Sequence, residues 1–141
     1  MSRADKNTLE QKKREIYSDF LNNFDQNPFT GVLARVTNEE SVAQSIKNLV
    51  LTNQGERFYN SSKGSRVRQS LFEMFNQMSA DIVKQDLINY LSFYEPRCII
   101  NDIIVQGDTL DLNSFNIDII FQIINIPGQN FQVSLNVQRI R

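Results

Sequence analysis

The chain has 141 residues, 40% hydrophobic and 22% charged, which suits one compact domain with its own core. Its 15 Lys and Arg residues nearly balance 16 Asp and Glu residues, so the whole molecule has no strong field to attract nucleic acid or anionic lipid. It contains no histidine, which excludes Ser–His and Cys–His nucleophile pairs and removes the commonest zinc ligand. We expect no cofactor and no metal.

The start of the chain indicates the cellular compartment, and the single cysteine is interpreted separately. Residues 1–6 lead into a charged stretch without an apolar signal core, and the most apolar run, residues 117–126, is interrupted by polar side chains. This predicts a protein that is made and used in a cytosol-like compartment, or in a particle assembled there, and no membrane partner. Cys98 has no second cysteine to pair with, and we interpret it as a packing residue at the start of a strand.

The first 25 residues are expected to form a separable amphipathic helix or arm. Apolar residues recur there at near-helical spacing, namely Leu9, Ile16, Phe20 and Phe24. This face could belong to the core or dock on a partner helix. Pro28 should end the helix, so we divide the chain into an arm, residues 1–25, and one α+β domain, residues 26–141.

Three further helices are predicted between residues 37 and 96. A short β-prone segment, residues 30–37, precedes the first, and Thr37 and Glu40 have the spacing of a capping box. A polar loop, residues 52–65, separates the first helix from the second, which should cover residues 67–78. The third should begin at Ser79 as its N-cap and end at Pro96. Their apolar stripes are Val42, Ile46, Leu49 and Val50; Val67, Leu71, Phe72, Met74, Phe75 and Met78; and Val83, Leu87, Tyr90, Leu91 and Tyr94.

From Cys98 onward the apolar pattern has a period of two, which predicts three strands. Turn-forming residues at 126–130 should join the last two strands as an antiparallel hairpin. The expected fold is therefore α+β, with N-terminal helices packed on one face of a C-terminal antiparallel β-meander.

Glycoside hydrolysis is the enzymatic hypothesis, because two carboxylates about 5 to 10 Å apart suffice for it without histidine. The candidates are Glu56, Glu73 and Glu95. The sequence does not give their separation, and the chain has no Trp to form a sugar-binding cleft. We therefore expect no enzyme, and keep peptidoglycan hydrolysis as the alternative.

Nucleic-acid binding is a third hypothesis, since cations and aromatic side chains alternate in such sites. The candidates in and after the polar loop are Arg57, Phe58, Tyr59, Lys63, Arg66 and Arg68. Four cations among polar residues are more typical of a solvated loop, so we expect no nucleic-acid partner.

Glu95–Pro96–Arg97 is the most distinctive local motif. Glu95 falls at the carbonyl end of the predicted third helix, where a negative charge is unfavourable, which indicates a fixed cationic partner. Pro96 restrains the backbone, and Arg97 can grip a carboxylate through paired donors. A helix stop with ordinary surface charges is the simpler interpretation of this motif alone.

Several segments, in their order and spacing, resemble the baseplate wedge family of T-even-type and related contractile phages over about residues 17 to 141. They are residues 27–31, 41–42, 46–52, 55–57, Gly64, 71–73 and 94–97, with the closing residues 137–141. The resemblance implies a virion protein of the tail baseplate that initiates the contractile sheath. Its implied partners are other wedge proteins and the tail sheath protein, with the tail tube or hub as further candidates.

The resemblance also assigns site residues. Glu95, Pro96 and Arg97 match the family's characteristic contact to the wedge core, and Gly55, Glu56 and Arg57 match a second family motif. The chain departs from the family after Arg57, where residues 58–59 replace a Pro-containing turn and residues 60–63 lack the usual acidic residue. We further expect a free edge of the C-terminal sheet to template sheath strands by main-chain hydrogen bonds.

Overall fold

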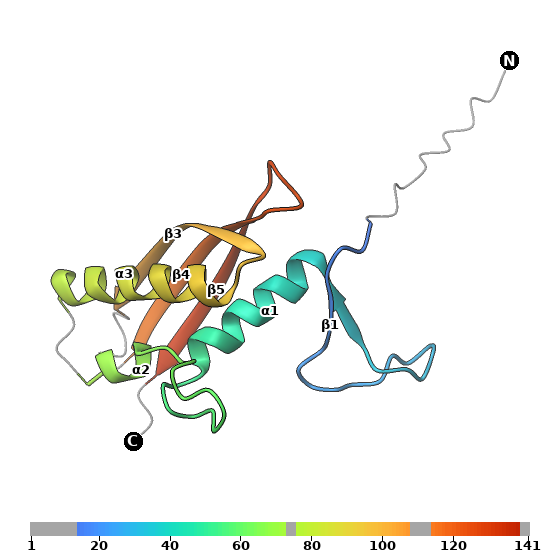
Figure 1. The fold of residues 1–141 in the computed structure, drawn as a ribbon, viewed down its shortest axis with the longest axis horizontal. Coiled ribbons are helices and arrows are strands. Elements are labelled where there is room, and N and C mark those ends of the chain that lie inside the picture. Colours follow the sequence, from blue (N-terminus) through green and yellow to red (C-terminus); the bar gives the residue numbers. More distant parts are fainter. Residues whose placement is uncertain (1–13, 73–75, 108–113, 139–141) are drawn as a thin grey trace, which may run out of the picture.

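The computed structural model describes residues 14–72, 76–107 and 114–138 (Figure 1). In chain order its elements are β1 (Ser18–Phe20), β2 (Arg35–Thr37), α1 (Asn38–Leu51), α2 (Val67–Ser70), α3 (Gln77–Tyr94), β3 (Cys98–Gly107), β4 (Ser114–Ile123) and β5 (Asn130–Gln138). The helices precede the main sheet, and a small two-stranded sheet precedes the helices. The predicted α+β class is confirmed.

The main sheet is an antiparallel meander in the order β3-β4-β5. Ile119, in the central strand, lies opposite Ile103 of β3 and Val133 of β5. Alternate residues of β4 are buried, as the period of two requires of a strand with one covered face. Those buried residues are Phe115, Ile117, Ile119, Phe121 and Ile123. The predicted strands and the hairpin between β4 and β5 are confirmed.

The helices cover this buried face. Helix α3 packs along β3, while α1 and α2 pack beside β5 (Figure 1). Their apolar stripes join the side chains of β4 in one core, to which α1 contributes Val42, Ile46, Leu49 and Val50, and α3 contributes Val83, Leu87 and Leu91. The prediction that helices pack on one face of the meander is confirmed.

The helix predicted within residues 5–25 is wrong over residues 14–25, and residues 5–13 lie outside the described part of the chain. Here β1 pairs antiparallel with β2. The side chain of Asn38, which begins α1 at a φ of 48°, accepts hydrogen bonds from the backbone N–H groups of Ile16 and Tyr17. These long-range bonds satisfy backbone donors that a helix would have paired locally. The division between arm and domain at residue 25 stays a prediction.

Two helix boundaries also differ from expectation. The helix predicted over residues 67–78 is only α2, four residues long, and residues 73–75 lie outside the described ranges. Helix α3 begins at Gln77 with Asn76, rather than Ser79, as its N-cap. The Asn76 side chain accepts from the Ser79 N–H, and the Ser79 hydroxyl accepts from the Asn76 N–H. Such a reciprocal capping box fixes the start of a helix. Thr37 precedes α1 but makes no side-chain cap.

Candidate partner-binding site

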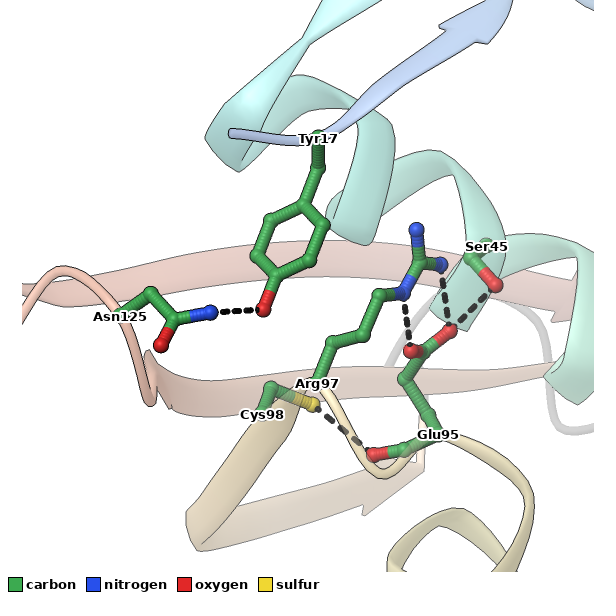
Figure 2. A network of polar contacts seen from close by, with 6 residues as sticks. All are labelled: Tyr17, Ser45, Glu95, Arg97, Cys98 and Asn125. Atoms are coloured by element: carbon green, nitrogen blue, oxygen red, sulfur yellow. Dashed lines mark hydrogen bonds and ion pairs between the residues drawn. The ribbon is translucent and has the colours of Figure 1, made fainter. Parts of the chain in front are cut away.

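The Glu95–Pro96–Arg97 turn connects α3 to β3. Glu95 is the C-cap of α3, and its N–H donates to the Leu91 carbonyl at 2.8 Å. Pro96 stops the helix, as predicted. Arg97 turns back toward Glu95, with its Nε 2.6 Å from Oε1 and its Nη2 2.9 Å from Oε2 of the carboxylate (Figure 2). This two-pronged pairing is the strongest geometry available to an arginine and a carboxylate.

Glu95 is also held by α1. The Ser45 hydroxyl donates to Oε2 of Glu95 (Figure 2), and the Glu95 side chain is only 3% exposed. Burial raises the pKa of Glu95, but the hydrogen bonds from Arg97 and Ser45 and the positive charge of Arg97 lower it by more. The pKa therefore lies below the usual value. Glu95 is a buried, ionised carboxylate that ties α3 to α1.

Arg97 extends this network to the surface. Its guanidinium carbon lies 5.5 Å from the centre of the Tyr17 ring, a distance at which the ring face attracts the cation. The Tyr17 hydroxyl accepts from Nδ2 of Asn125 in the β4–β5 turn (Figure 2). Arg97 keeps 30% of its side chain exposed, and Pro96 is exposed. The turn thus presents Pro96, part of Arg97 and the neighbouring Tyr17 to solvent.

The fixed cationic partner expected for Glu95 is Arg97 of the same chain. Glu95 itself is covered, so of the three residues in the motif only Pro96 and Arg97 have surface that another protein could reach. Sequence reasoning missed Ser45, Tyr17 and Asn125, which are far from the motif along the chain. None of them stands in a local pattern that would have indicated this contact.

Gly55, Glu56 and Arg57 lie in the loop after α1. Gly55 has a φ of 86°, which favours glycine. The Glu56 carboxylate accepts from the Asn53 N–H at 2.8 Å, closing the turn. Arg57 is exposed. The motif therefore shapes the loop through Gly55 and Glu56 and leaves Arg57 available.

The two motifs lie on neighbouring elements but do not bond to each other within the described residues. Their link is Tyr94, the residue before Glu95. Its ring lies 5.6 Å from Nζ of Lys63, and its hydroxyl is 3.4 Å from the Ser62 hydroxyl. The loop is thereby placed against the end of α3.

The geometry gives little support to hydrolysis. A catalytic acid needs a raised pKa and access to substrate, whereas Glu95 is buried with a lowered pKa. Glu56 is engaged in its own turn, and Glu73 lies outside the described residues. Within the described ranges, no group of three Cys, Asp or Glu side chains could hold a metal ion.

Cys98 follows the motif and is buried at the start of β3, as predicted. Burial, and next the negative charge of Glu95, raise the pKa of the thiol to about 12. Only the thiolate reacts quickly with alkylating reagents. We expect a maleimide to label the native protein at pH 7.5 at least about a hundredfold more slowly than the urea-unfolded chain, measured by mass spectrometry. Equal rates would contradict this burial.

In the described part of the chain, no helix is long and apolar enough to cross a membrane.

The family model described as baseplate wedge protein gp25 matches residues 36–127, more than half of the chain. This match contains both the Gly55–Glu56–Arg57 and the Glu95–Pro96–Arg97 motifs. No curated protein sequence is significantly similar.

Solved structures with TM-scores above 0.6 share the fold. A protein of Geobacter sulfurreducens proposed to be a tail lysozyme is 19% identical, with a TM-score of 0.65 over 73% of this chain and 92% of its own. A chain of the anti-feeding prophage baseplate is 23% identical, with a TM-score of 0.67 over 79% of this chain and 89% of its own. A chain of the contracted pyocin R2 baseplate is 15% identical, with a TM-score of 0.49 over 82% and 98%.

Proposed function

The chain belongs to the baseplate wedge protein gp25 family and so has a structural role in the baseplate of a contractile tail system, within which we propose two finer tasks. The Glu95–Pro96–Arg97 turn binds the wedge core, and the C-terminal sheet templates the first ring of the tail sheath. Assembly takes place in the host cytoplasm, and the tail tube or hub is a further candidate neighbour.

The contact to the wedge core is supported by the rigidity of the turn. Glu95 forms an ion pair with Arg97 and accepts a hydrogen bond from Ser45 of α1. Arg97 also lies over the ring of Tyr17, in the segment before β1. A partner that meets Pro96 and the exposed part of Arg97 therefore meets groups already fixed in place, which reduces the entropy lost on binding.

Sheath templating is carried by one observation: β5 pairs with β4 alone among the described strands. Every second residue of an antiparallel strand directs its N–H and C=O away from its partner, so β5 offers a row of unpaired backbone groups along its outer edge. Its uncovered face is polar, formed by Gln132, Ser134, Asn136 and Gln138. Because this face is polar, β5 does not expose a large apolar surface before an incoming strand pairs with its edge.

The test uses lysines to block the edge, because charged side chains on an edge strand oppose pairing with another chain. A Gln132→Lys and Asn136→Lys double variant should retain a cooperative thermal transition and still enter the baseplate. We expect it to reduce the number of sheathed tails per baseplate by at least about tenfold, counted by electron microscopy.

The matched control is Gln122→Lys, which adds a charge to the same sheet on the central strand, where no edge is available. It should leave sheath formation unchanged. A Ser134→Pro variant tests the edge through the backbone instead. Normal sheath growth with all three variants would sink the templating proposal while leaving the structural role intact.

We infer a non-enzymatic role from the positions of the candidate carboxylates. The likeness to the Geobacter protein, at 19% identity, concerns the fold, and activity resides in particular side chains rather than in a fold. Here Glu95, a candidate catalytic carboxylate, is buried and forms an ion pair with Arg97 of the same chain.

A further inference from the structure

The loop between α1 and α2, residues 52–65, is held in shape by its own backbone. The backbone N–H of Ser65 donates to the Thr52 carbonyl at 2.8 Å and closes the base of the loop. The backbone N–H of Gly55 donates to the Ser61 carbonyl at 2.9 Å across the middle of the loop. Asn53 passes so close to Gly64 that a Cβ on this glycine would overlap the Asn53 backbone. The loop is thus an ordered projection, and whatever lies at its tip is presented in a fixed position.

Two adjacent aromatic residues occupy this tip. Phe58 is 100% exposed and Tyr59 is 106% exposed. Single exposed apolar residues are common on protein surfaces, but two neighbouring aromatic rings held wholly in water on an ordered loop are not explained by packing within the chain. Aromatic side chains bury about 150 to 250 Å² each and dominate the energetics of many interfaces.

Charge identifies the kind of surface that this tip fits. Residues 52–68 contain one acid, Glu56, and four bases, Arg57, Lys63, Arg66 and Arg68, a net charge of +3 in a chain whose total is −1. None of the four bases forms an ion pair with a described carboxylate. The segment that carries the exposed rings is therefore net positive, and Arg57 is directly next to them in sequence, which favours an acidic partner.

We propose that Arg57, Phe58 and Tyr59 dock into an apolar cleft with an acidic rim on a neighbouring baseplate protein. The two rings would fill the cleft, and Arg57 would pair with a carboxylate at its edge, as in interfaces with an apolar centre and a polar rim. This contact rests on the baseplate role proposed above but is separate from the Glu95–Pro96–Arg97 turn.

A protein partner suits the geometry better than a nucleic acid. Binding to single strands needs a track of free cations that follows the phosphates. Here Lys63 lies over the Tyr94 ring, and Nε of Arg66 donates to Oε1 of Gln54, so these two cations face their own chain. Arg57 alone stands beside the exposed rings at the tip.

The experiment places p-benzoylphenylalanine in place of Phe58 in assembled baseplates, which are irradiated and analysed by peptide mass spectrometry. The matched control carries the same group in place of Phe29, which is 95% exposed but has no charged residue beside it in sequence. We expect position 58 to cross-link to an acidic, apolar segment of another baseplate protein at least about five times more than position 29 does. Adding Arg57→Glu should reduce this yield severalfold.

A second measurement covers the aromatic rings directly. When a Phe58→Ser and Tyr59→Ser double variant competes with the wild-type chain for incorporation, we expect a loss of about tenfold or more, against no loss for Phe29→Ser. Equal incorporation, a cross-link no stronger than at position 29, or a cross-link to a second copy of this chain would overturn the proposal. The proposal would also be overturned if the wild-type chain bound a dT20 oligonucleotide and the double variant did not. Absence of the wild-type chain from baseplates would overturn the baseplate role as well, whereas presence without the cross-link would overturn this contact alone.

Discussion

Replacing Phe121 by alanine is expected to lower the free energy of unfolding by about 4 kcal/mol. Phe121 is fully buried in the central strand of the sheet, and its ring centre lies 5.8 Å from that of Phe131 in β5. Removing the ring loses its burial and leaves a cavity that the surrounding strands and helices can only partly fill. Urea unfolding followed by circular dichroism measures the change, since the chain has no Trp to report it by fluorescence.

The control is Gln122→Ala, at the next position along β4. Its side chain points to the opposite face of the sheet and is only partly buried, so its removal should change stability by no more than about 0.5 kcal/mol. Similar effects of the two substitutions would show that the buried and exposed faces of β4 are wrongly assigned.

Glu95→Ala is expected to cost about 2 kcal/mol of stability. The substitution leaves the Arg97 guanidinium, which is 30% exposed, without its carboxylate and the Ser45 hydroxyl without its acceptor. Breaking a fully buried ion pair costs about 3 to 5 kcal/mol, and the solvent contact of Arg97 reduces this figure. A double-mutant cycle with Arg97→Ala should give a coupling of about 1 kcal/mol or more. Additive effects would contradict the pairing.

This contribution should depend on pH. The folded state lowers the pKa of Glu95, so its ionised form stabilises the fold at every pH above the unfolded value of about 4.3. The contribution is lost as pH falls through the lower folded-state pKa. The difference in unfolding free energy between the wild type and Glu95→Gln is therefore expected to be constant near neutral pH and to shrink below about pH 4. A difference that grows on acidification would contradict the sign of the shift.

The sheet could be predicted because its signal is local and repeated. Alternation from Phe115 to Ile123 identifies the buried face of β4, and the turn residues 126–130 fix the hairpin that follows. Helix α3 was predicted for the same reason, with Pro96 marking its end. These features require only the geometry of neighbouring residues along the chain.

The arm and the network around Glu95 could not be predicted, because both depend on contacts between distant residues. Residues 14–25 have helix-like spacing, yet β1 pairs with β2 and Asn38 binds the backbone before β1. Asn is among the residues that tolerate a positive φ, which is the one local hint at position 38. Glu95 was predicted as a site residue, but Ser45 and Tyr17, 50 and 78 positions earlier, have no pattern that would join them to it.

The baseplate role is tested most directly by co-purifying this chain with candidate wedge proteins, in parallel with a Glu95→Ala and Arg97→Ala double variant whose fold is checked by circular dichroism. We expect the wild type to form a stable complex, the folded double variant to lose it, and neither to release sugar from peptidoglycan. Failure of the wild-type chain to join the complex, together with hydrolysis of peptidoglycan, would contradict a structural role and point to an enzyme.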